Sequence, residues 1–181
     1  MDAHQLEPRD LMRRVAAGEA DAAALLFLRY GDVVYRYLRG RGAAPADAED
    51  LTQEVFLRAL AHAGSYRGRG SLEGWLVRTA RARLIDRARE ESARERRERA
   101  WAEESPRTEE PGPPDPSSGL VSRLMGALSP DDREVIVLAR FLGFPAQRIG
   151  EVLEITAGAA RVRLHRALGR LAETYQEVEA R

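Results

Sequence analysis

The chain has 181 residues, 29 basic and 29 acidic side chains, a formal net charge of zero and no cysteine. This length suits one or two small domains, and the neutral total excludes a general basic coat, so nucleic-acid binding would require local segregation of charge. Without cysteine there is no disulfide framework and no thiolate metal site, and the three histidines are too scattered to indicate a metal cluster. The polar N-terminus is unlike a signal peptide and no apolar run reaches membrane-spanning length, so we expect a soluble, cytoplasmic protein without membrane insertion.

The predicted elements in the first half of the chain are helices, because apolar residues recur at helical spacing and no convincing strand alternation occurs. We expect helices over 8–17, 21–39 and 46–63, and a fourth from the N-cap Ser71 into the nineties. A glycine-rich loop, 65–70, connects the last two. Together these elements predict a four-helix domain over residues 1–102.

A second domain is expected after an abrupt change in composition. Residues 103–119 contain five prolines, five acids, one arginine and no large apolar side chain, which predicts a flexible acidic linker. Beyond it, Ser129 and Pro130 begin a helix that should run to about residue 142, followed by a short helix over 145–153 and a final helix capped by Thr156. The fold class is therefore all-α, with two small helical domains, the second over residues 120–181.

Charge is segregated along the chain. Residues 64–89 hold seven arginines against two acids, residues 155–170 hold four arginines and no acid, and residues 46–57 hold four acids and no base. A generic solvated surface mixes the two signs, so this pattern favours specific partners for each segment.

The helices over 145–153 and from 156 onward have the proportions of a helix-turn-helix. In the second helix Ala160 and Leu164 belong to a stripe expected to be buried, and Arg161, Val162, His165 and Arg166 lie on the opposite side. Arginine can read guanine edges, valine can contact a thymine methyl, and Arg163 and Arg148 are better placed for phosphates. The alternative is an ordinary helical hairpin with solvated arginines.

Acidic residues gather on the third predicted helix, where Asp47, Asp50 and Glu54 share a face beside Gln53 and Arg58. No histidine, partner base or phosphate-binding loop accompanies them, so we predict no catalytic residue, no metal and no cofactor. Two interpretations remain open: a solvated helix start favoured by the helix dipole, or a docking face for a basic partner.

The segment after this helix combines a flexible arginine-rich loop with two aromatic residues, Tyr66 and Trp75. Arginines and aromatic rings near a mobile loop suit single-stranded nucleic acid, whose bases stack on both. The following helix is expected to turn Leu72 and Leu76 inward and to leave Arg78 and Arg81 facing out. For Trp75 itself, core packing is the preferred interpretation.

The order of these segments resembles that of bacterial sigma factors. Residues 47–59 (DAEDLTQEVFLRA) are similar to their core-binding motif, and residues 66–87 to their promoter-melting segment. Residues 128–135, 149–153 and 163–167 are similar to their C-terminal helix-turn-helix. Two domains joined by a linker match the extracytoplasmic-function (ECF) group of the sigma-70 family.

The resemblance implies partners and a role for each segment. RNA polymerase core would be contacted through the β′ clamp helices and the β flap, promoter DNA would be bound at two elements, and an anti-sigma factor is common in this group. The residues implied in core binding are Asp47, Asp50, Gln53, Glu54, Leu57 and Arg58. Those implied at the −10 element are Ser65, Tyr66, Arg67, Arg69, Arg78 and Arg81. Those implied at the −35 element are Arg148, Thr156, Arg161, Val162, Arg163, His165 and Arg166.

The sequence departs from the family pattern at several positions. Ala82 stands where asparagine is usual, Val162 replaces a small polar residue, and Glu154 replaces the glycine of the turn, so a residue with a Cβ is expected in a left-handed conformation. Two alternatives stay open: a DNA-binding regulator that uses only its C-terminal domain, and a degenerate sigma-like interaction protein, which these departures motivate.

Overall fold

The computed structural model describes residues 6–102 and 120–179 of the chain. Every regular element within these residues is a helix, which confirms the all-α prediction. The predicted linker, 103–119, lies outside the described residues.

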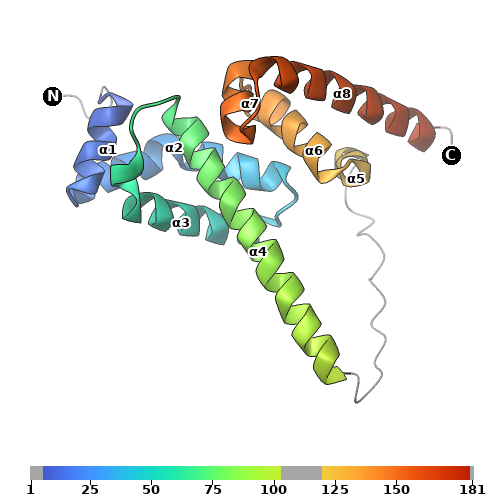
Figure 1. Ribbon diagram of the computed structural model, residues 1–181, viewed down its shortest axis with the longest axis horizontal. Coiled ribbons are helices and arrows are strands. Elements are labelled where there is room, and N and C mark those ends of the chain that lie inside the picture. The colour runs from blue at the N-terminus through green and yellow to red at the C-terminus, as the bar shows by residue number, and fades with distance from the viewer. Residues whose placement is uncertain (1–5, 103–119, 180–181) are drawn as a thin grey trace.

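The N-terminal helices form a small bundle around the first half of a long helix (Figure 1). They are α1 (Pro8–Ala16), α2 (Ala20–Gly40), α3 (Pro45–Ala61), the short 3-10 helix η2 (Ala63–Ser65) and α4 (Leu72–Ala102). Pro8 and Pro45 occupy the first turns of their helices, where proline has no hydrogen bond to lose. The bundle is held by side chains that are almost completely buried, among them Leu11, Leu26, Leu51 and Leu76. The distal part of α4 extends away from the other helices (Figure 1).

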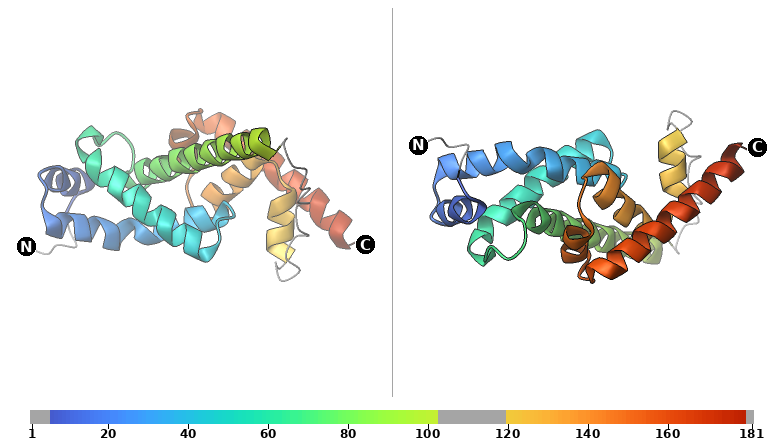
Figure 2. Two further views of the ribbon diagram at one scale, coloured as in Figure 1. Left: turned by 90° about the horizontal axis from the view of Figure 1, so that it is seen from below. Right: turned by 90° about the horizontal axis from the view of Figure 1, so that it is seen from above.

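The C-terminal helices are α5 (Leu120–Ala127), α6 (Pro130–Ile136), α7 (Ala146–Leu153) and α8 (Ala157–Glu179). α5 and α6 lie against α8 (Figure 2). The Ser129 side chain caps α6 by accepting a hydrogen bond from the Asp132 N–H at 3.2 Å, as the sequence predicts. The single helix expected to residue 142 is divided, because the α-helix ends at Ile136 and continues as a π-helical segment, η3 (Val137–Phe141).

The two helical groups are in contact, which the sequence did not predict. α7 packs on α4, and η3 packs on α2. Val137, Ile149 and Val152 of the C-terminal group are buried in the same apolar cluster as Val34 and Leu76 of the N-terminal group. In the described residues, no helix is long and apolar enough to cross a membrane.

Candidate functional site

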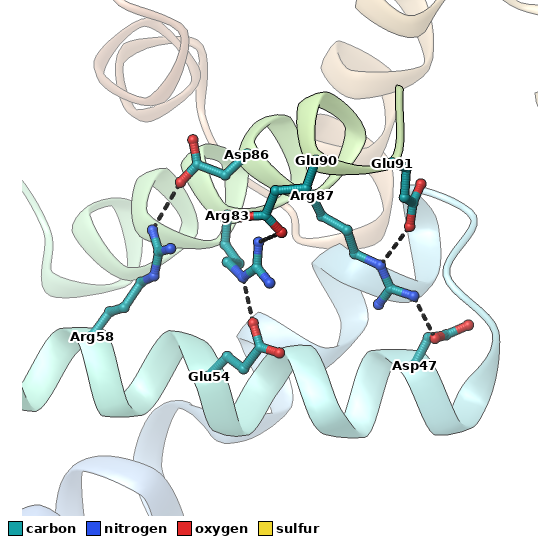
Figure 3. Close-up of polar contacts among 8 residues, drawn as sticks. All are labelled: Asp47, Glu54, Arg58, Arg83, Asp86, Arg87, Glu90 and Glu91. Atoms are coloured by element: carbon teal, nitrogen blue, oxygen red, sulfur yellow. Dashed lines mark hydrogen bonds and ion pairs between the residues drawn. The ribbon is translucent and has the colours of Figure 1, made fainter. Parts of the chain in front are cut away.

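The acidic helix and the arginine-rich helix lie side by side and neutralise each other across their contact (Figure 3). Arg58 on α3 pairs with Asp86 on α4 at 2.9 Å. In the middle, Arg83 on α4 pairs with Glu54 on α3 and, at 3.2 Å, with Glu90 on its own helix. At the far end, the Arg87 Nη2 atom lies 2.8 Å from Asp47, and its Nε atom lies 2.9 Å from Glu91. We call this series of ion pairs the α3–α4 ladder.

The ladder raises the pKa of two of its arginines, Arg83 and Arg87. Only 13% of the Arg83 side chain is exposed, and the hydrogen bond that Arg83 donates to Glu54 raises the pKa of Arg83 although burial opposes this. The pKa of Arg87 is raised by hydrogen bonds to Glu91 and Asp47. Both cations are thus held in place by two carboxylates each, and neither is available as an unpaired charge.

The residues expected to bind core polymerase therefore divide into two sets. Asp47, Glu54 and Arg58 face α4 and belong to the ladder. Asp50, Gln53 and Leu57 are exposed, with 66% of Leu57 accessible. We call these last three residues the outer face of α3.

The loop before α4 has a fixed shape. The Tyr66 ring packs edge-on against Trp75 with centroids 5.9 Å apart, and the Tyr66 hydroxyl donates to the Gly70 carbonyl at 3.2 Å. Gly68 has φ +69°, and a Cβ there would lie 2.4 Å from Cδ of Arg9 on α1, so only glycine fits. The Ser71 hydroxyl accepts a hydrogen bond from the Gly74 N–H at 3.0 Å, which confirms the predicted N-cap.

The residues expected at the −10 element are distributed over three cavities. A cavity of about 570 Å³ between α3, α4 and α7 is lined by Ser65, Arg78 and Arg81, with Ala82 among its other residues. Tyr66 and Arg67 line a second cavity of about 870 Å³ against α1, and Arg69 lines a smaller one of about 300 Å³. Trp75, expected in the core, packs against the core and also lines the first and the smallest of these cavities.

The helix-turn-helix is formed by α7 and α8. Glu154 ends α7 with φ 58° and ψ 40°, which confirms the predicted left-handed residue. A Cβ on Gly150 would lie 2.6 Å from the Ile155 carbonyl oxygen, so this glycine allows the close turn between the helices. The Thr156 hydroxyl accepts a hydrogen bond from the Ala159 N–H at 3.1 Å and so caps α8 as predicted.

The predicted reading face of α8 is exposed. Arg161, His165 and Arg166 lie at the surface, and 52% of Val162 is accessible. Arg163 is half-buried on the flank. On the opposite side Ala160 is completely buried, as the spacing of the apolar stripe predicts.

Arg81 differs from the expectation that it faces outward. Its Nε atom donates to both carboxylate oxygens of Glu134 on α6, at 3.1 and 3.2 Å. The Tyr37 hydroxyl donates to the same carboxylate at 2.6 Å, and only 3% of Glu134 is exposed. Burial, followed by the charge of Glu134, raises the pKa of Tyr37 well above its ordinary value, so the phenol stays a donor. No sequence pattern indicates this cluster, because its members are far apart in the chain.

Arg148 is likewise not on the surface shared by the other −35 residues. Its Nη1 atom lies 2.6 Å from Glu73 on α4, and its guanidinium lies over the Phe144 ring, 5.0 Å from the centroid. Arg81 and Arg148 thus join the two helical groups. Among the described residues, no group of three or more histidines or acids is placed to hold a metal ion.

Comparison with known families identifies both helical groups. Residues 26–94 match the Sigma-70 region 2 family, and residues 118–171 match the Sigma-70 region 4 family. The chain is 34% identical to the ECF RNA polymerase sigma factor BldN of Streptomyces coelicolor, over 94% of this chain and 67% of BldN. It is 32% identical to the sigma factor CarQ of Myxococcus xanthus, over 93% of this chain and 97% of CarQ. SigL of Mycobacterium tuberculosis is 35% identical, over 92% of this chain and 98% of SigL.

Solved structures share the fold. CnrH, solved with the cytosolic domain of CnrY, superposes with a TM-score of 0.70 at 24% identity, over 97% of this chain and 99% of CnrH. The sigma factor RpoE of Bartonella quintana has a TM-score of 0.63 at 22% identity, over 83% of this chain and 94% of RpoE. With both sigma regions matched in order and relatives aligned over nearly the whole chain, the protein belongs to the ECF group of the sigma-70 family and directs RNA polymerase to promoters.

Proposed function

We propose that separate surfaces of this sigma factor bind promoter DNA and RNA polymerase. The exposed face of α8 reads the −35 element as duplex, and the loop before α4 captures the −10 element with the adjoining arginines. The outer face of α3 docks on the β′ clamp helices, and region 4 contacts the β flap. The protein acts in the cytoplasm as a specificity subunit and has no catalytic activity of its own.

The −35 assignment rests on the difference between the two faces of α8: one face is exposed and carries arginines, and the other is buried. Arg161 and Arg166 form no ion pair with any described residue, in contrast to the arginines of the α3–α4 ladder. A capped helix N-terminus at Thr156 adds backbone N–H groups that suit a phosphate. Bidentate arginine contacts to guanine are each worth about 1–3 kcal/mol of discrimination against a wrong base.

The −10 assignment is supported by the shape of the loop. Its backbone is fixed by Tyr66, Gly68 and Ser71, and residues of the loop line three cavities. Extruding a base from the duplex costs a few kcal/mol of stacking and pairing, which a preformed loop can offset. Arg78 is exposed on α4 and borders two of these cavities, which places it to hold the strand backbone.

Reconstituted transcription tests the proposal. The protein is combined with core RNA polymerase on genomic DNA, and the 5′ ends of the transcripts are sequenced. We expect transcripts that share upstream −35 and −10 sequences. Arg161→Ala should lower their yield, whereas Arg96→Ala, an exposed arginine on the distal part of α4, should leave it unchanged. A wild-type protein that yields no promoter-specific transcript contradicts the proposal and favours a degenerate, interaction-only protein.

The outer face of α3 distinguishes a sigma factor from a regulator that uses only its C-terminal domain, because such a regulator has no need of a polymerase-docking helix. Charge reversal at Asp50 should weaken polymerase binding and leave duplex binding by α8 unchanged. Equal polymerase affinity of the two proteins would favour the regulator.

An anti-sigma factor is a further partner in this proposal. RpoE of Bartonella quintana has been solved with the anti-sigma factor NepR. On this chain Leu28 is 79% exposed on α2, and Leu57 is exposed on α3, so both offer apolar surface to a partner. An anti-sigma factor should remove the promoter-specific transcripts of the wild-type protein and act less on Leu28→Arg.

A further inference from the structure

Helix α1 lies outside the residues that match the Sigma-70 region 2 family, 26–94, yet it contacts the loop to which we assign the −10 element. We propose that Arg9 of α1 is a positioning residue for −10 capture. Its aliphatic stem crosses Gly68 and holds the loop, 65–70, in the shape that receives DNA. This inference rests on the proposed function of the loop, and it gives Arg9 a role through the loop rather than through a contact with DNA.

α1 is a firm support for the loop, because one side of it belongs to the core. Leu11 and Met12 are almost completely buried, and Val15 is 6% exposed. Just before the helix, Nη1 of Arg29 on α2 donates to the Leu6 carbonyl at 2.7 Å, which fixes the chain where α1 begins. A side chain on the other side of α1 is therefore presented to the loop from a fixed backbone.

The stem of Arg9 makes the contact between α1 and the loop. A Cβ on Gly68 would lie 2.5 Å from Cγ of Arg9 and 2.9 Å from its Nε atom, so the stem runs directly over the Cα of this glycine. The three heavy atoms nearest to such a Cβ all belong to Arg9. Long charged side chains commonly pack their methylene groups in this way and keep the charged head in water.

The middle of the loop has few other supports. The Tyr66 hydroxyl bonds to the Gly70 carbonyl and ties the two ends together. Between them, Arg67, Gly68 and Arg69 form no hydrogen bond with any described residue. A segment without backbone hydrogen bonds depends on packing for its order. In this segment the packing comes from Arg9.

The order of the loop should matter for DNA binding. A loop that receives an extruded base in only one of its shapes binds with an affinity reduced by the fraction of molecules in that shape. Removing the stem of Arg9 lowers this fraction without removing any group that we assign to DNA. The −35 surface on α8 is unaffected, because it shares no residue with this contact.

A direct contact of Arg9 with a DNA phosphate is the alternative, and a neighbouring arginine separates the two. Arg9 and Arg13 both line the cavity of about 870 Å³ between α1 and the loop. Arg13 pairs with Asp10 at 3.0 Å, and 77% of its side chain is exposed. Arg13→Ala therefore removes a charge from the same cavity and leaves the stem over Gly68 in place.

Holding the stem and removing the charge distinguishes the two roles within Arg9 itself. Arg9→Met keeps an unbranched stem of similar reach without a cation, whereas Arg9→Ala removes both. The probe is a fork DNA taken from a promoter mapped by transcript sequencing, duplex through the −35 element and single-stranded over the −10 element of the non-template strand. Binding is measured with the complex of the sigma factor and core polymerase.

We expect Arg9→Ala to weaken binding of the fork DNA by about tenfold, and Arg9→Met and Arg13→Ala to stay within about threefold of wild type. All variants should bind a −35 duplex equally. Equal binding of the fork by Arg9→Ala and wild type overturns the inference. Binding by Arg9→Met as weak as that by Arg9→Ala also overturns it, because the charge is then responsible. A wild type that does not prefer the fork to one with a scrambled −10 strand contradicts the proposed function instead.

Limited digestion with trypsin examines the loop without DNA, because trypsin cleaves after arginine and Arg67 and Arg69 are exposed. Mass spectrometry identifies each cut. Cleavage after these two residues should be at least about threefold faster in Arg9→Ala than in wild type, and unchanged in Arg9→Met. Cleavage after Arg96 on the distal part of α4 should be equal in all proteins and controls for general stability. Equal cleavage of the loop in Arg9→Ala and wild type overturns the inference.

A double substitution tests the contact itself. Gly68→Ala should weaken binding of the fork DNA, because its Cβ collides with the stem of Arg9 and its φ of +69° disfavours a side chain. In the Arg9→Ala background the collision is absent, so the combined loss should be smaller than the product of the two single losses. Losses that simply multiply show that the two residues act independently, and they overturn the inference.

Discussion

Arg170, in the second half of α8, forms a two-point ion pair with Asp132 in the first turn of α6. Its Nε atom lies 2.6 Å from Oδ2, and its Nη2 atom donates to Oδ1. Asp132 is buried, and a hydrogen bond with Ser129 also lowers the pKa of its carboxyl group. The pair fixes α8 to α6, so the direction in which α8 points is set by a charge contact as well as by packing.

This pair predicts a pH-dependent stability. Hydrogen bonding by Arg170 lowers the pKa of Asp132 below its ordinary value, so its stabilisation is complete above the pKa of the unfolded chain, about 4, and is lost as the pH falls through the folded value. Asp132→Asn should therefore lower the unfolding free energy at pH 7, and the difference from wild type should shrink toward pH 3. Denaturant unfolding of the variant and the wild type at both pH values measures this difference. The exposed neighbour provides the control as Asp131→Asn, and a difference that is constant with pH would falsify the assignment.

Glu154 predicts opposite effects for two substitutions at the turn. A non-glycine residue in the left-handed region costs roughly 1–2 kcal/mol, and glycine adds about 0.5–1 kcal/mol of unfolded-state freedom. Glu154→Gly should thus be neutral or stabilising by up to about 1 kcal/mol, whereas the β-branched Glu154→Val should destabilise by about 1–3 kcal/mol. Thermal unfolding of the two variants decides this, and equal effects would contradict the backbone geometry.

Asp50 lies on the outer face of α3 and Glu54 belongs to the ladder, so substitutions of these two acids should differ in their effects on polymerase binding and on stability. Asp50→Arg should weaken the binding of core polymerase and leave stability unchanged, because Asp50 is exposed. Glu54→Arg places a positive charge against Arg83, which is largely buried, and should also lower the unfolding free energy by about 1 kcal/mol. Polymerase titration and denaturant unfolding of both variants separate docking from folding. Similar losses of stability would show that the division is wrong.

Salt dependence probes the arginines of α8. If Arg166 contacts a phosphate, Arg166→Ala should lower the slope of log affinity against log salt for −35 duplex by about one unit. Arg96→Ala provides a matched exposed arginine far along α4. A slope that stays the same for Arg166→Ala would remove this residue from the interface.

Local signals in the sequence predicted the elements well. Ser71, Ser129 and Thr156 cap their helices as expected, because a hydroxyl before an apolar run satisfies backbone N–H groups within a few residues. The left-handed Glu154 was predictable for the same reason, since the turn constrains its own backbone. The boundaries of α1 to α3 lie within two residues of the predicted ones, whereas α4, expected to reach the nineties, continues to Ala102.

Contacts between distant segments were not predictable. Glu134 lies within a helical segment and shows no sign of Tyr37, 97 residues earlier in the chain, or of Arg81, 53 residues earlier. Charge counting identified an acidic helix and the arginine-rich segment that follows it in the chain, yet it could not give the register that joins Arg83 to Glu54. Helical periodicity specifies which side of a helix is apolar, and pairing between helices depends on how the whole bundle packs.

The ladder and the two interdomain pairs hold five arginines, Arg58, Arg81, Arg83, Arg87 and Arg148, against acids at short range. Such pairs act as dipoles whose fields fade within the screening length of physiological salt, about 8 Å. A molecule of zero net charge is not drawn to DNA from a distance, so its diffusional search gains little from electrostatic steering. We therefore expect the free sigma factor to be a poor searcher of the genome, and the polymerase that carries it to perform the search.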